Sequence, residues 1–171
     1  MASTLPDEIN LDRIRLCHIL RRMFFAALST LLLLGLLGVY GVRIAEVSGT
    51  AGGYELTVRY ASVSRPGLAT PWSVEVRRPG GFQGPVTLAT TDEYFDLFDE
   101  NGLDPDPQKA TDDGQRIIWE FEAPEQGDTL TVSFDARIEP AQQLRRVAAR
   151  TAVLDDGAVA VSVDYATFVM P

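Results

Sequence analysis

An uncharged apolar stretch of twenty residues, 23–42, constrains this chain more than any other feature of its sequence. A helix rises about 1.5 Å per residue, so twenty residues cover roughly 30 Å, the thickness of the hydrocarbon core of a bilayer. We therefore expect a transmembrane helix over residues 23–42. It would separate a tail of residues 1–22 from a larger part on the other side of the membrane.

The basic residues that flank this stretch predict its orientation. Arg13, Arg15, Arg21 and Arg22 precede it, whereas only Arg43 follows it closely. Because basic flanks stay on the cytoplasmic side, we expect a cytoplasmic tail and an extracytoplasmic C-terminal part, in the plasma membrane. A cleaved signal peptide is the alternative, although the apolar part of a signal peptide is ordinarily only about 7 to 15 residues long.

Small residues recur at every third position in the second half of the expected span, at Gly35, Gly38 and Gly41. Small residues let helices approach closely, so these glycines are a candidate contact face for another integral membrane protein. The spacing of three differs from the usual four-residue spacing of such faces. The alternative is that the glycines belong to the ordinary composition of membrane helices.

The part of the chain after the span is acidic and lacks two reactive residue types. Residues 43–171 carry 11 basic and 21 acidic side chains, a net charge of −10. Such a surface repels nucleic acid and anionic lipid headgroups, so neither is an expected partner. Cys17 and His18, the only cysteine and histidine, both precede the span. Residues 43–171 therefore offer no disulfide, no Ser-His-Asp or Cys-His site and no zinc site of the usual kind, and we expect a non-catalytic domain without a cofactor.

The pattern of apolar residues predicts a domain of β-strands over residues 54–171. The small residues at 47–53 indicate that 43–53 is a flexible linker, and period-two alternation begins at Tyr54. Seven runs have strand character: 54–61, 72–77, 86–90, 115–122, 129–139, 144–154 and 158–169.

The run at 144–154 is the ambiguous one, because its first half is also compatible with a helix. Its alternation leads into Asp156-Gly157, a dipeptide typical of hairpin turns, which favours a strand. Seven strands separated by Gly, Pro and Asp turns predict an immunoglobulin-like or fibronectin-like β-sandwich, without the cysteine pair of antibody domains.

One short helix is expected between the strands, over residues 92–98 with Thr91 as its N-cap. It concentrates aromatic side chains, and a preceding hairpin adds Phe82. Tyr94, Phe95, Phe98 and Phe82 have two interpretations: they fill an open end of the core, which is the commoner case, or they form an exposed contact patch for a partner.

An acidic stretch covers residues 92–113 and supplies the only metal candidates in the domain. Hard cations such as Ca²⁺ bind oxygen-rich loops. The candidate ligands are Asp96, Asp99, Glu100, Asp104 and Asp106. Their spacing does not fit the EF-hand loop, and the alternative is a solvated acidic rim.

Together these features predict a single-pass membrane protein that works as a binding or accessory module. Its expected partner is another integral membrane protein. The rival hypothesis is a tethered or secreted acidic domain that binds a cation or an envelope polymer through residues 92–113.

Overall fold

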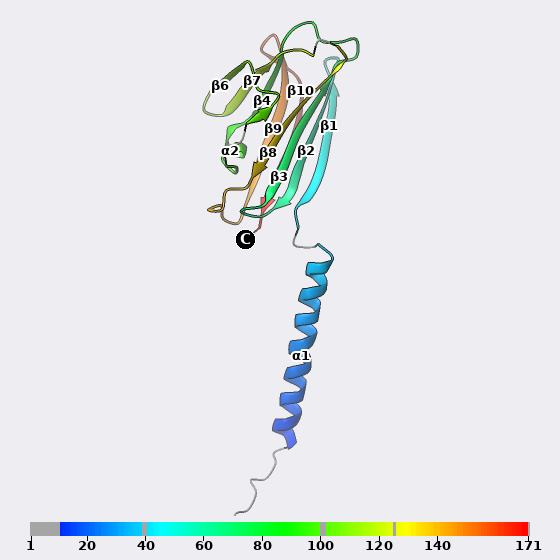
Figure 1. Ribbon diagram of the computed structural model, residues 1–171, viewed down its shortest axis with the longest axis vertical. Coiled ribbons are helices and arrows are strands. Elements are labelled where there is room, and N and C mark those ends of the chain that lie inside the picture. The colour runs from blue at the N-terminus through cyan, green and yellow to red at the C-terminus, as the bar shows by residue number, and fades with distance from the viewer. Residues whose placement is uncertain (1–10, 39–40, 100–101, 125, 171) are drawn as a thin grey trace, which may run out of the picture. The chain divides into compact units, whose positions relative to one another are not determined.

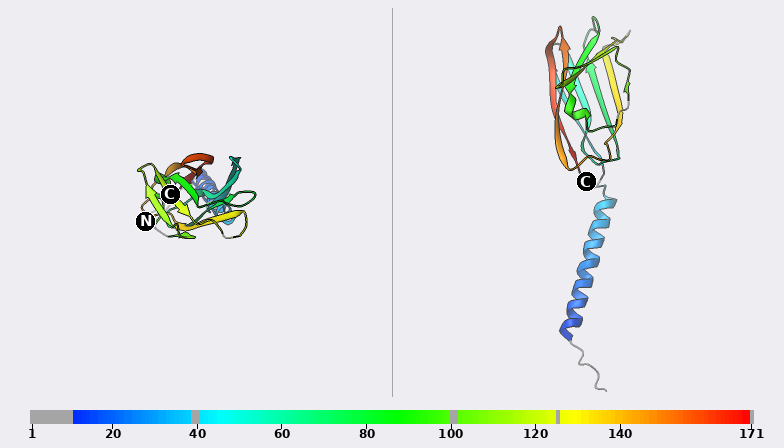
Figure 2. Two further views of the ribbon diagram at one scale, coloured as in Figure 1. Left: turned by 90° about the horizontal axis from the view of Figure 1, so that it is seen from above. Right: turned by 90° about the vertical axis from the view of Figure 1, so that its left-hand side faces the viewer.

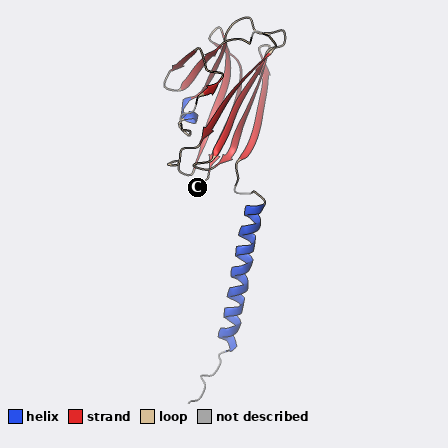
Figure 3. Ribbon diagram, viewed as in Figure 1, coloured by secondary structure: helices blue, strands red, loops and turns tan. Residues whose placement is uncertain are grey.

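The computed structural model describes residues 11–38, 41–99, 102–124 and 126–170. The chain divides into two compact units, Met1–Tyr40 and Gly41–Pro171. The first contains helix α1 (Leu11–Leu36), and the second is a domain of strands with one short helix (Figures 1 and 3). We call the second unit the β domain.

Helix α1 is longer at its start and shorter at its end than the expected span of 23–42. The segment Ile14–Leu36 is long and apolar enough to cross a membrane. The helix stops because Gly38 takes a left-handed conformation (φ +67°), and the backbone N–H of Gly38 donates to the carbonyl of Gly35 at 3.0 Å. Gly38 and Gly41 thus follow the helix, and the prediction that they share a helical face with Gly35 is wrong.

The described residues of the β domain form ten strands in one hydrogen-bonded sheet. The strands are β1 (Arg43–Ala51), β2 (Tyr54–Ser64), β3 (Ala69–Arg77), β4 (Val86–Thr91), β5 (Leu103–Asp104), β6 (Lys109–Asp112), β7 (Arg116–Phe121), β8 (Thr129–Arg137), β9 (Arg145–Asp155) and β10 (Ala158–Val169). Their order is β5-β8-β3-β2-β10-β9-β4-β7-β6, and β1 pairs with β2 outside this path.

All seven expected strands are present, and the prediction of a mostly-β domain is confirmed. The count of about seven is wrong, because β1, β5 and β6 are additional. The ambiguous run at 144–154 is a strand, β9, and it turns into β10 at Asp156 (φ +49°) and Gly157 (φ +79°). These two left-handed residues are what a tight hairpin requires.

The expected linker over residues 43–53 is wrong for most of its length, because β1 occupies residues 43–51. β1 pairs antiparallel with β2 from Arg43 opposite Val63 to Ala51 opposite Tyr54. Its small residues serve close packing rather than flexibility. A Cβ atom on Gly49 would lie 3.1 Å from a methyl group of Val163 on β10, so β1 and β10 approach closely.

The sheet curls on itself, so that one face encloses the core (Figure 2). β2 and β10 are parallel and join through only two residue pairs, Phe168 with Val63 and Val169 with Ser64. Period-two alternation along β8 places Leu130, Val132 and Phe134 inside and the intervening residues outside. β5 and β8 at one end of this order and β7 near the other end carry side chains that line one cavity.

Candidate functional site

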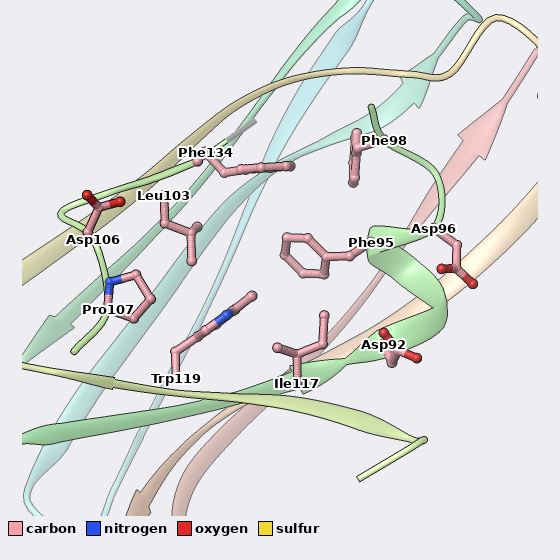
Figure 4. A pocket seen from close by; sticks show the side chains of 11 residues that line it. Asp92, Phe95, Asp96, Phe98, Leu103, Asp106, Pro107, Ile117, Trp119 and Phe134 are labelled. Atoms are coloured by element: carbon pink, nitrogen blue, oxygen red, sulfur yellow. The ribbon is translucent and has the colours of Figure 1, made fainter. Parts of the chain in front are cut away.

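An open cavity of about 610 Å³ lies between the two ends of the curled sheet (Figure 4). β5 and β8 contribute one wall and β7 the other, and the short helix α2 (Asp92–Phe95) closes one side. The lining residues are Asp92, Phe95, Asp96, Phe98, Gly102, Leu103, Asp106, Pro107, Ile117, Trp119 and Phe134.

Phe95 is at the centre of the aromatic side chains that form the floor of this cavity. Its ring centroid lies 5.1 Å from that of Trp119 and 5.4 Å from that of Phe134. On its inner side it lies 5.2 Å from Trp72, at an interplanar angle of 83°. Edge-to-face contacts of this kind contribute about 0.5 to 1.5 kcal/mol each beyond the burial of area. Phe95 itself stays half-buried, so its outer edge is available to a ligand.

The segment that carries Phe95 is fixed on both sides. α2 is shorter than the expected helix over 92–98, and Thr91 occupies the N-cap position without a capping hydrogen bond from its side chain. Instead, the Thr91 hydroxyl accepts a hydrogen bond from the backbone N–H of Arg150 on β9 at 2.9 Å. After the helix, the backbone N–H of Asp99 donates to the carbonyl of Arg137 on β8 at 3.0 Å. The cavity floor is therefore held between two distant strands.

Buried hydrogen bonds support the floor from the core side. The indole N–H of Trp72 donates to the hydroxyl of Tyr165 at 2.9 Å, and that hydroxyl lies 3.0 Å from the hydroxyl of Thr151. Thr151 in turn lies 3.0 Å from Thr90. Burial raises the pKa of the Tyr165 hydroxyl. It therefore stays protonated at neutral pH and continues to link β3, β4, β9 and β10.

Three carboxylates, from Asp92, Asp96 and Asp106, lie among the residues that line the cavity. Partial loss of hydration raises the pKa of Asp92, and the negative charges of Asp112, Asp96 and Asp113 raise it further. The opposite holds for Asp113, whose pKa is lowered by hydrogen bonds from the side chain and backbone of Arg116. The mutual repulsion at Asp92 would be relieved by a positive charge bound nearby.

The four aromatic residues singled out in the sequence have different environments. Tyr94 is fully buried, and its hydroxyl lies 2.9 Å from that of Thr167. Phe95 and Phe98 line the cavity, although only 7% of Phe98 is exposed. Phe82 is half-buried against the core and does not line the cavity. A shared exposed patch of all four is therefore wrong, and the cavity combines two of them with Trp119, Phe134, Leu103 and Ile117.

The candidate metal ligands are not brought together as a set. Asp96 and Asp106 line the cavity, whereas Asp99 and Asp104 are exposed and do not. Glu100 lies outside the described residues. Within the described part of the chain, no group of three or more His, Cys, Asp or Glu side chains is arranged to hold a metal ion. The expected acidic loop is also partly ordered into β5 and β6.

Comparison with protein-family models gives no match, and no curated protein is significantly similar to this sequence. An aromatic floor beside carboxylates suits a ligand that combines an apolar or aromatic group with a positive charge, since aromatic faces and carboxylates both attract cations.

Proposed function

We propose that this chain is a single-pass plasma-membrane protein with a cytoplasmic N-terminus and an extracytoplasmic β domain. From Met23 to Leu36, α1 carries no charged residue and covers roughly 21 Å. Residues 37–42 are also free of charge in the sequence. On the N-terminal side, Arg21 and Arg22 extend their long side chains to the headgroups, and their charge supports the cytoplasmic placement.

We infer that the curled sheet is a β-sandwich of the immunoglobulin-like or fibronectin-like type. One layer would contain β1, β2, β3, β8 and β5, and the other β10, β9, β4, β7 and β6. Support comes from the seam between β2 and β10, which is parallel and only two residue pairs long. The pairings within each proposed layer are antiparallel and, apart from that of β5 with β8, at least four residue pairs long. A sandwich leaves its strand edges and connecting segments free to build binding surfaces.

The function that the cavity supports best is non-catalytic binding, and the aromatic floor beside three carboxylates is the observation that carries it. Cavities of several hundred Å³ with an apolar lining and a few polar groups are typical ligand sites. Here the charged groups are carboxylates alone among the described lining residues, with Phe, Trp, Leu, Ile, Pro and Gly forming the rest. This composition favours recognition of a cationic and apolar surface over bond cleavage.

The occupant we propose is a segment of another integral membrane protein that presents an apolar or aromatic side chain beside a Lys or Arg. Only six residues separate α1 from β1, so the β domain would work close to the bilayer. A partner embedded in the same membrane meets this condition at high effective concentration. The domain's net charge of −10 further favours a basic partner surface.

The alternative is that residues 92–113 bind a cation or an envelope polymer. One observation favours the polymer version: the aromatic faces and carboxylates of the cavity are also a suitable arrangement for a polyhydroxylated chain, which would contact the rings and donate hydrogen bonds to the acids. A cation version predicts a rise in melting temperature at millimolar Ca²⁺.

Photo-cross-linking in native membranes tests the proposal. A photoreactive amino acid replaces Ile117 in the cavity, and the control carries it at Ser162, an exposed position on β10. We expect one integral membrane protein to be cross-linked from position 117 and not from 162, and Asp92→Asn/Asp96→Asn to weaken the capture. Capture of a polymer instead, or equal capture from both positions, would contradict the accessory role.

A further inference from the structure

One end of the β domain differs in charge from the rest of it. This end, which we call the basal end, is formed by residues 41–45, 60–71, 140–149 and 165–170, around the start of β1 and the finish of β10. These segments contain four arginines and no acidic residue, within a domain that carries 21 acidic and 11 basic side chains. The arginines are Arg43, Arg65, Arg145 and Arg146. Acids adjoin these segments at Glu46, Glu139 and Asp164, and Asp135 on β8 pairs with Pro71 on β3, so the basal end is less acidic than the rest of the domain rather than remote from acids. Glu139 accepts a hydrogen bond from Gln142, and Asp164 forms an ion pair with Arg150.

The strand register places basic and aromatic side chains in one row across the basal end. Arg43 on β1 pairs with Val63 on β2, Val63 pairs with Phe168 on β10, and Phe168 pairs with Arg146 on β9. Paired residues project from the same face of a sheet, and neighbouring strands lie about 4.8 Å apart. Arg43, Phe168 and Arg146 are all exposed, so the row presents an aromatic ring with one cation on each side of it.

Exposed apolar side chains concentrate at the same end. Among the described residues of the β domain, five large hydrophobic side chains are exposed, and four of them lie here. They are Ile44, Leu68, Leu144 and Phe168, and Leu144 is the most open at 61%. The fifth, Val159, follows the turn between β9 and β10 at the opposite end. Cations interspersed with apolar side chains are typical of surfaces that bind the bilayer interface.

Three of the arginines of the basal end lack an ion-pair partner among the described residues, unlike others in the domain. Arg77, Arg116 and Arg150 form ion pairs with neighbouring carboxylates. Arg43, Arg145 and Arg146 form none with any residue that the structure describes. Guanidinium groups that lack a carboxylate partner suit phosphate oxygens, which they bind through paired N–H donors.

Covalent connection holds the basal end near the bilayer. Arg43 follows Leu36, the last residue of α1, by seven positions, and seven extended residues reach at most about 25 Å. We propose that the basal end binds the anionic phospholipid headgroups of the leaflet it faces, and so fixes the orientation of the β domain. This inference rests on the proposed membrane anchoring. It also revises the expectation from net charge, which holds for the domain as a whole but not for this end.

Headgroup quenching of a fluorophore tests the proposal on the full chain in vesicles. The chain carries Cys17→Ser and a labelled cysteine in place of Leu144, and the comparison chain carries the label in place of Val159. Vesicles contain either phosphatidylcholine alone or 30% phosphatidylglycerol, each with a headgroup-linked quencher. We expect strong quenching at position 144 only in the anionic vesicles, and little at 159 in either.

Charge variants then separate specific contact from mere proximity. In Arg43→Gln/Arg145→Gln/Arg146→Gln we expect loss of the quenching, because each arginine changes the ratio of docked to undocked domain by about fivefold. Arg77→Gln/Arg116→Gln/Arg150→Gln makes the same change in charge elsewhere and should keep it. Quenching that is equal in both vesicle types, or unaffected by the first variant, overturns the proposal.

Two further readouts make the outcomes distinguishable. Protection of the label at position 144 from quenching that grows with the protein-to-lipid ratio would mean that a second copy covers the basal end, which also overturns the proposal. Protease protection of the same vesicles reports whether the chain has inserted. Failure to insert refutes the membrane anchoring itself, whereas insertion without charge-dependent quenching refutes only the docking of the basal end.

Discussion

Removing the hydroxyl of Tyr165 tests whether the buried hydrogen bonds beneath the cavity hold the β domain together. In Tyr165→Phe, the indole N–H of Trp72 loses its acceptor at 2.9 Å, and Trp72 is only 1% exposed, so water cannot replace it. A buried donor left without a partner costs about 1 to 3 kcal/mol. Thr151 loses its contact with Tyr165 but keeps its hydrogen bond with Thr90 at 3.0 Å, so its own change adds little to the loss of stability. We therefore expect a loss of about 2 kcal/mol in the free energy of unfolding.

The matched control is Tyr60→Phe. Tyr60 is half-buried and packs against Tyr165 in a tilted arrangement, with ring centroids 4.8 Å apart. Its hydroxyl forms no hydrogen bond with the described residues. Deleting that hydroxyl should change stability by less than about 0.5 kcal/mol. The two variants thus remove the same atom from neighbouring rings, and only one removal leaves a buried donor unpaired.

Urea unfolding of the full chain in lipid nanodiscs, followed by tryptophan fluorescence, measures both variants. Trp72 and Trp119 are the only tryptophans and both lie in the β domain, so the signal reports this domain and not α1. For a domain of this size, 2 kcal/mol corresponds to a fall of roughly 6 to 10 °C in Tm. Equal losses in Tyr165→Phe and Tyr60→Phe would refute the argument, because hydrogen bonding would then contribute nothing beyond packing.

Three other perturbations have expected outcomes. Gly52→Ala should cost about 1 kcal/mol more than Gly53→Ala in urea unfolding, because both glycines have positive φ but only the first would place its Cβ 3.1 Å from a carbonyl oxygen on β10. The hydrogen bond from Arg150 lowers the pKa of Asp164 in the folded state. Asp164 therefore stabilises the fold at pH values above its ordinary pKa of 3.8, and this stabilisation is lost as the pH falls through the lower pKa of the folded state. Asp164→Asn should therefore flatten the acid-side loss of stability, and an unchanged stability profile between pH 2.5 and 7 would contradict this. Cross-linking from the cavity to a basic partner should weaken as pH falls through the raised pKa of Asp92, whereas in Asp92→Asn we expect weaker capture with less dependence on pH.

The strands that could be predicted from the sequence are those whose own residues alternate. Leu130, Val132 and Phe134 in β8 mark one face at every second position, and Asp156-Gly157 marks the turn before β10. β1 has no comparable pattern. Its residues 47–51 are small or polar, and it forms a strand because β2 offers it a full set of backbone partners. A nonlocal pairing of this kind leaves no local signal.

The cavity was only partly predictable, and the reason is the order of strands in the sheet. The aromatic content of residues 94–98 indicated either a core plug or a contact surface, and Phe95 does both: it packs on Trp72 and faces the cavity. Trp119 and Phe134 were not singled out, because they read as ordinary core positions of β7 and β8. They line one cavity only because the sheet curls until these strands approach, and a single sequence does not specify strand order.

The seam between β2 and β10 also bears on when this domain can fold. The hydroxyl of Thr167 donates to the carbonyl of Ala61 at 2.6 Å, across 106 residues of sequence. β2 and β3 come early in the chain and can pair with each other once both are synthesised, yet their contact with β10 waits for residues 158–169. During synthesis the inner face of β2 therefore stays uncovered along this seam, and chaperones have their best opportunity to act before β10 arrives. A chain truncated within β10 would keep β2 and β3 but lack the residues that close the seam.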